Sequence, residues 1–127
     1  MVKRNIIVLC LFAALLLGVL LEQSYIDNSL KTMEKETIML LDEIETEQLD
    51  SSSTHVLKMK KFWEDKEFVL SLFVDYKEIE QIGRQIELIE AHLDNIDFEL
   101  AAVECELLLH IVKTYYQTVC FDWQNII

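Results

Sequence analysis

The sequence predicts an all-α protein in which an N-terminal transmembrane helix is followed by an antiparallel bundle of three or four helices. Sixteen apolar residues form an unbroken run at positions 6–21. The chain has no proline, and Gly83 is the only glycine after that run, so the turn residues that strand folds need are missing. Apolar residues then recur at helical spacing through most of the remaining chain.

The apolar run follows two cations, Lys3 and Arg4, and two kinds of targeting segment begin this way. A spanning helix needs about 20 apolar residues, with about 17 as the lower limit, whereas a cleaved signal is shorter and ends at a small-x-small site. No such site follows Leu21, which favours an uncleaved signal anchor at 6–21 over a cleaved signal. The positive-inside rule then keeps residues 1–5 in the cytoplasm and places residues 22–127 outside the cytoplasmic membrane.

The segment outside the apolar run is strongly acidic. Residues 22–127 hold nine of the eleven basic residues and all 23 acidic ones, for a formal charge of −14. Nucleic acid and anionic lipid would both be repelled, so neither is an expected partner. We interpret the carboxylates as solvated helix faces rather than as a cation-binding surface.

Two helices are expected in the first half of the exterior segment. The first runs from about 25 to 49, and the second from about 54 to 74, after a polar break at Asp50–Thr54 that can supply an N-cap. Trp63 is expected to anchor the core of the second helix, and a bend is expected near Asp75. The stripe of the first helix consists of Ile26, Leu30, Met33, Thr37, Leu40, Leu41 and Ile44.

From position 79 the apolar residues alternate in steps of three and four, which is the spacing of a heptad seam. The seam consists of Ile79, Ile82, Ile86, Ile89, Leu93, Ile96, Leu100, Val103 and Leu107. One long helix in a coiled coil or two helices hinged at Asp94–Asp97 would both produce it. The stripe widens after Leu100, which indicates burial among several neighbours. We therefore favour the hinge and four helices in up-down order.

Cysteine spacing argues against a disulfide within the last helix. Cys105 and Cys120 lie fifteen residues apart, which is about 22 Å along a helix, whereas a disulfide tolerates a Cα separation of at most about 7 Å. Both are expected to be buried or interfacial thiols.

The polar residues form no recognisable catalytic or metal-binding motif. His110 follows Glu106 by one turn, but a di-iron bundle needs Glu-x-x-His motifs on two helices, and neither this pair nor Glu90–His92 has that spacing. His55 is expected to face water. No nucleophile motif or phosphate-binding glycine loop is present. We predict a non-enzymatic protein with no cofactor and no metal site.

The final segment is apolar and contains the candidate partner-binding residues. They are Trp123, Asn125, Ile126 and Ile127. Such a tail either folds back on the bundle or docks a partner.

The pattern resembles a family of short, single-pass membrane proteins of unassigned function from clostridia and related spore-forming bacteria. The resemblance rests on the basic start with one anchor, Trp63, the stretch through Ile79 and Ile82, Asp97, His110-Ile111 and the closing Asn125-Ile126-Ile127. The family often has proline or histidine before the third helix, where this chain has Asp75-Tyr76. The resemblance implies no catalytic residues, and it implies an accessory role beside a multi-pass membrane protein.

The leading hypothesis is a membrane-anchored accessory or adaptor protein that works outside the cytoplasmic membrane with a protein partner. The alternative is a scaffold that self-associates through the Ile79–Leu107 seam as an intermolecular coiled coil. An extracytoplasmic ligand-sensing bundle is a third reading, disfavoured because only residues 1–5 remain inside to receive a signal.

Overall fold

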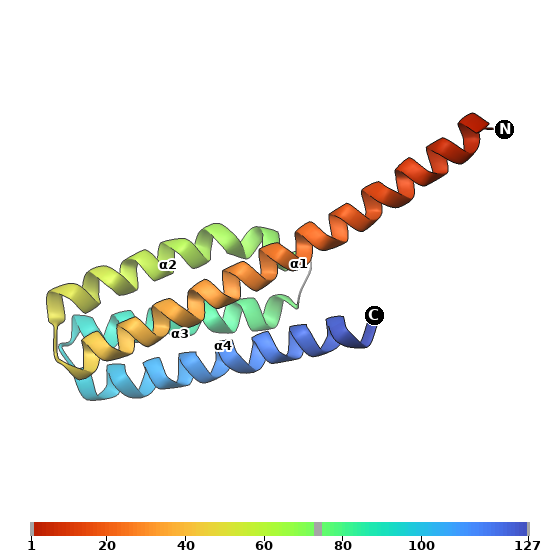
Figure 1. The fold of residues 1–127 in the computed structure, drawn as a ribbon. Helices are drawn as coiled ribbons and strands as arrows, with labels where there is room; N and C mark the ends of the chain where they lie inside the picture. The colour runs from red at the N-terminus through yellow and green to blue at the C-terminus, as the bar shows by residue number, and fades with distance from the viewer. Residues whose placement is uncertain (1, 73–74, 127) are drawn as a thin grey trace.

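Four helices make up the computed structural model, which describes residues 2–72 and 75–126, with side chains described through position 118. The helices are α1 (Val2–Glu45), α2 (Leu49–Ser71), α3 (Tyr76–Asp94) and α4 (Phe98–Ile126). Each helix packs on the next one in the chain, and α4 packs back on α1, which closes an up-down ring (Figure 1). The all-α prediction with four helices is confirmed for these ranges, which contain no strand.

Helix α1 runs without a break from an exposed half into a buried half. Its N-terminal half projects away from the other three helices, as Figure 1 shows. Within the described ranges, α1 alone is long and apolar enough to cross a membrane, and its most apolar stretch is entirely unburied. The C-terminal half buries Ile26, Ser29, Leu30, Met33, Thr37, Leu40 and Ile44. The predicted stripe is confirmed except at Leu41, which is only partly buried.

The turn between α1 and α2 lies earlier than predicted. Helix α1 ends at Glu45, Glu47 adopts a left-handed φ of 56°, and α2 begins at Leu49. The predicted break at Asp50–Thr54 is wrong, because those serines are accommodated within the helix. Ser52 Oγ donates to Leu49 O, and Ser51 Oγ donates to Glu43 Oε2 across the turn.

The second turn is close to its predicted position. Asp75 caps α3 by accepting a hydrogen bond from the Lys77 backbone N–H at 3.1 Å. Trp63 on α2 is buried in the core, as predicted, and its Nε1–H donates to the Ile79 carbonyl at the start of α3. One indole thus supplies both apolar area and a polar tie between consecutive helices.

The hinge between α3 and α4 is confirmed, but only half of the predicted seam is buried. Helix α3 buries Ile79, Ile82, Ile86, Ile89 and Leu93, whereas Ile96, Leu100, Val103 and Leu107 are exposed. Helix α4 instead buries Ala101, Cys105, Leu108, Val112 and Tyr115. The second half of the seam prediction is therefore wrong. Its cause is the turn, where Ile96 takes a left-handed φ of 56° and α4 starts with a new rotational phase.

Candidate functional site

The predicted partner-binding residues lie at the end of α4. Trp123, Asn125 and Ile126 belong to its last two turns, and their side chains lie outside the described part of the structure. Ile127 also lies outside the described residues. The assignment of these four residues to a partner therefore stays a prediction.

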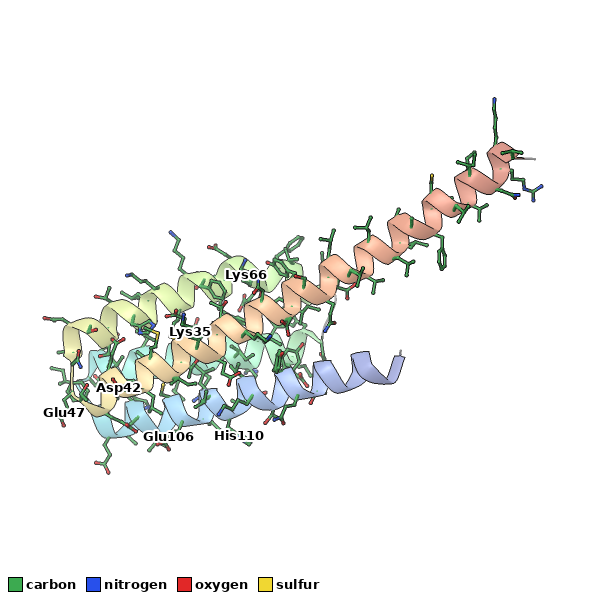
Figure 2. The ribbon with its side chains drawn as sticks, in the orientation of Figure 1. Lys35, Asp42, Glu47, Lys66, Glu106 and His110 are labelled. Carbon is green, nitrogen blue, oxygen red and sulfur yellow. The ribbon has the colours of Figure 1, made fainter. Side chains whose placement is uncertain are left out.

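An apolar surface that was predicted to be buried lies open on α4. Leu100, Val103 and Leu107 are 46%, 55% and 45% exposed, and we call these three residues the α4 stripe. They recur at steps of three and four, so they follow one face of the helix for two turns. Glu106 and His110 are exposed on the same helix (Figure 2). A row of aliphatic side chains edged by charged ones has the composition of a protein-binding surface.

The main polar cluster joins α1 to α2 around His55. The imidazole Nδ1 lies 2.6 Å from Glu43 Oε1, and Nε2 lies 2.5 Å from Glu36 Oε2. The ring is buried, so the prediction that His55 faces water is wrong. The reason is the early start of α2 at Leu49, which extends the helix around position 55 and lets α1 cover it.

Both ring nitrogens of His55 are engaged, each by one of the two carboxyl groups on α1. Neither ring nitrogen keeps a free lone pair, so His55 ties α1 to α2 and is unavailable as a general base. An open groove of about 430 Å³ runs beside it.

A second polar contact joins α3 to α4. Gln85 is buried, and its Nε2 donates to the Glu104 carbonyl at 2.9 Å and to Glu104 Oε2 at 2.5 Å. One amide thereby satisfies a helix carbonyl and a carboxylate at once. This residue holds the two helices in register.

A groove of about 280 Å³, lined by four glutamates together with Lys60 and Arg84, lies between α2 and α3. Gly83 leaves room there for Glu67. A Cβ at Gly83 would stand 2.8 Å from Glu67 Oε1. Burial, followed by the charges of Glu64, Glu87 and Glu80, raises the pKa of the Glu67 carboxyl. The close approach of Glu67 explains the one glycine of the bundle. Charged side chains at this groove do not by themselves define a ligand.

The described thiol of α4 is inert. Cys105 is fully buried, as predicted, and its Sγ lies 3.6 Å from the Thr37 carbonyl of α1. Burial raises its pKa to about 12, so the nucleophilic thiolate is not formed at neutral pH. Cys120 has its side chain outside the described set.

The titratable side chains described here do not converge on a metal. Among residues 2–72 and 75–118, no three His, Cys, Asp or Glu side chains form a group that could hold an ion. In the His55 trio the two carboxylates contact opposite nitrogens of the ring. The three side chains therefore do not surround a common position where a metal could bind.

A family model described as a domain of unknown function (DUF4363) matches residues 20–126. The chain belongs to this family. The DUF4363 match begins at the end of the apolar run and takes in the buried half of α1 and all of α2, α3 and α4. No curated protein matches the chain, and no solved structure matches it.

Sequence reasoning missed the His55 trio and the α4 stripe for different reasons. The trio left a weak signal, because Glu36 and Glu43 lie seven residues apart and so share one face of a helix. The α4 stripe gave a misleading signal, because its residues continue the three-and-four spacing of the α3 seam without interruption.

Proposed function

We propose that this protein is a non-enzymatic, membrane-anchored accessory or adaptor protein whose bundle works outside the cytoplasmic membrane. The observation that carries the proposal is the continuity of α1, whose exposed apolar half passes without a turn into the core of the bundle. A continuous helix would hold the bundle rigidly over its anchor, and anchoring raises its effective concentration near a membrane partner.

The proposed topology follows from charge. Lys3 and Arg4 precede the apolar run and would stay in the cytoplasm, leaving 22–127 outside as a single bundle. The resemblance to short single-pass proteins of spore-forming bacteria supports the same arrangement. It also supports an accessory role beside a multi-pass membrane protein. The polar clusters described above support helix packing, which agrees with a binding role.

The α4 stripe is the proposed partner-facing surface. Leu100, Val103 and Leu107 are exposed on α4, which runs along the length of the bundle (Figure 1). If the bundle stands on the membrane, these side chains would meet a neighbouring membrane protein. Burying exposed aliphatic area is the main source of affinity in such contacts. Trp123, in the last two turns of α4, is a second proposed contact nearer the membrane.

Site-specific photocrosslinking in the native cells tests the proposal. A photoreactive amino acid replaces Val103 or Leu107 in α4, and replaces the equally exposed Leu57 of α2 as the matched control. We expect one multi-pass membrane protein in the adducts at 103 and 107 and not at 57. Replacing Trp123→Ala should weaken its recovery and leave helicity unchanged. Equal adducts at all three positions, or none with a partner, would reject the adaptor role.

A self-associating scaffold is the second candidate, and the structure limits which part of the seam could form its interface. The Ile79–Leu93 half of the seam is buried inside the bundle, so the α4 stripe is the part of the seam left to pair with another copy. The mass of the purified full chain in mild detergent separates the two functions. A concentration-independent dimer that Leu107→Glu converts to a monomer favours the scaffold. A monomeric mass for both the wild type and the Leu107→Glu variant excludes it.

A further inference from the structure

Among the side chains that the structure describes in the bundle, three of the most exposed apolar ones lie at the end from which α1 emerges. Phe68 and Leu72 at the end of α2 and Tyr76 at the start of α3 are 74%, 62% and 61% exposed. We call these three residues the basal patch. Of the remaining large apolar residues described after position 21, only Ile96, in the turn at the opposite end, is as exposed. Such side chains would carry a cost in water without a surface to cover them.

Contacts between α1 and its neighbours fix the level of the basal patch along the anchor. Lys66 of α2 lies with its Nζ 4.8 Å from the centre of the Tyr25 ring, and Lys66 and Leu21 line one groove. Figure 2 shows Lys66 near the end of α2, close to the point where α1 leaves the bundle. Because α2 runs antiparallel to α1, Leu72 lies about 9 Å beyond Lys66 in the direction of the anchor. That level coincides with the last turn of the apolar run.

A contact between α4 and α1 also shows how far the bundle extends toward the apolar run. Tyr116 Oη donates to Asp27 Oδ1 at 2.6 Å, which places position 116 beside position 27 of α1. The α4 backbone continues for ten more residues to Ile126. That length is about 15 Å, which brings the end of α4 to the level of the apolar run. Two chain segments besides α1 thus reach past the base of the core.

We propose that the basal patch inserts into the interfacial region of the lipid bilayer that α1 crosses, so that the bundle rests on the membrane. The inference depends on the membrane anchor proposed above. The interfacial layer on each side of a bilayer is roughly 5–8 Å thick, and the basal patch begins within that distance of the end of the apolar run. Aromatic side chains favour this layer, where a ring is half desolvated and a tyrosine hydroxyl reaches water.

The lipid interface fits the basal patch better than a second copy of the chain does. Two copies anchored in one membrane stand side by side, so they would meet along their long faces and not at their bases. Asp75 and Glu78 outweigh Lys77 beside the basal patch, so the local charge is negative and does not favour anionic lipid. The contact is therefore apolar, and it should resist added salt.

Photocrosslinking to lipid in phosphatidylcholine vesicles tests this with the full chain. The photoreactive residue p-benzoylphenylalanine replaces Phe68 in one variant and Tyr76 in another, which keeps an aromatic ring at each exposed position. A third variant carries it at Ile96, which matches Tyr76 in exposure but lies at the far end of the bundle. A fourth carries it at Leu16 in the apolar run and reports insertion of the anchor. Circular dichroism confirms that each variant is helical.

We expect phosphatidylcholine adducts at 68 and 76 at about tenfold the yield at 96, unchanged within about twofold in 0.5 M salt. An adduct at 16 with yields at 68 and 76 no higher than at 96 would overturn the inference and leave the anchor intact. A loss of the adducts at 68 and 76 in salt would also overturn it, because the contact would then be electrostatic. No adduct at 16 would reject the membrane anchor itself, and the inference with it.

Discussion

Helices α3 and α4 share the same apolar spacing, but the residues that follow it are buried on α3 and exposed on α4. On α3 the seam residues between Ile79 and Leu93 face the core, whereas on α4 the seam residues Leu100, Val103 and Leu107 are exposed. Their buried counterparts on α4 follow one position later, at Ala101 and Leu108, which is a rotation of about 100° about the helix axis. Periodicity therefore shows that a helix has an apolar face, and the turn before the helix decides where that face points.

The largest difference is expected from matched alanine substitutions in the two stripes. Ile86→Ala on α3 removes a buried side chain and should lower the free energy of unfolding by about 2–5 kcal/mol. Leu107→Ala on α4 should change it by less than about 0.5 kcal/mol, because the side chain is already solvated. Denaturant unfolding of the full chain in mild detergent, followed by circular dichroism, measures both. Equal losses would show that the α4 stripe is covered, and a self-associated state would then have to be measured.

The next effect concerns the cap that restarts the helix after the hinge. Asp97 Oδ1 accepts a hydrogen bond from the Leu100 N–H at 3.1 Å in the first turn of α4. Asp97→Ala should lower the free energy of unfolding by about 1 kcal/mol, since a helix N-terminus loses its side-chain acceptor. Asp97→Ser keeps an acceptor and serves as the control in the same denaturant assay. An alanine variant as stable as the wild type would mean that the cap does not hold the phase of α4.

The strained residue of the hinge should give a smaller effect of opposite sign. Ile96 is a β-branched residue at φ 56°, a region that costs an L-residue about 1–2 kcal/mol, and its side chain is exposed. Ile96→Gly relieves that strain at an unfolded-state entropy cost of about 0.5–1 kcal/mol, so a net gain of about 0.5 kcal/mol is expected. Ile96→Val keeps the branched side chain and should gain nothing. A loss of stability with glycine would show that the side chain of Ile96 makes a contact that the turn needs.

A further small effect is expected where α4 meets α1 near the apolar half of α1. The hydrogen bond from Tyr116 is the main cause of a lowered pKa of the Asp27 carboxyl, followed by the contribution of Lys31 against the opposing effect of burial. A lowered folded-state pKa stabilises the protein above the ordinary value of 3.8, and this stabilisation is lost as pH falls through the lowered pKa. Tyr116→Phe should cost less than about 1 kcal/mol at neutral pH, because the carboxylate is partly solvated.

Unfolding curves of the wild type and the Tyr116→Phe variant between neutral pH and acid check this prediction. The difference in stability should shrink as Asp27 becomes protonated. Asp27→Asn is the control, and its stability should lack this contribution at every pH. A difference between wild type and Tyr116→Phe that stays constant into acid would assign the role of Tyr116 to packing alone.

Much of the fold followed from local physical chemistry. A chain without proline, with one glycine after the apolar run and with apolar steps of three and four, has few options other than packed helices. The stripe of α1, the burial of Trp63 and the hinge before α4 were predicted correctly on these grounds. The candidate sites were harder to predict, because the His55 trio joins residues twelve and nineteen positions apart and depends on where α2 begins.

The sequence by itself determined that this protein has helices, roughly where they end, and which one could cross a membrane, because each of these depends on neighbours within a few turns. Tertiary structure decided which apolar residues remain exposed. The rotation of α4 is set by a three-residue turn and by its packing on α1 and α3. The level of Phe68, Leu72 and Tyr76 relative to the apolar half of α1 depends on antiparallel packing, which no local pattern encodes. The candidate binding surfaces of this bundle are therefore the apolar residues that packing leaves exposed.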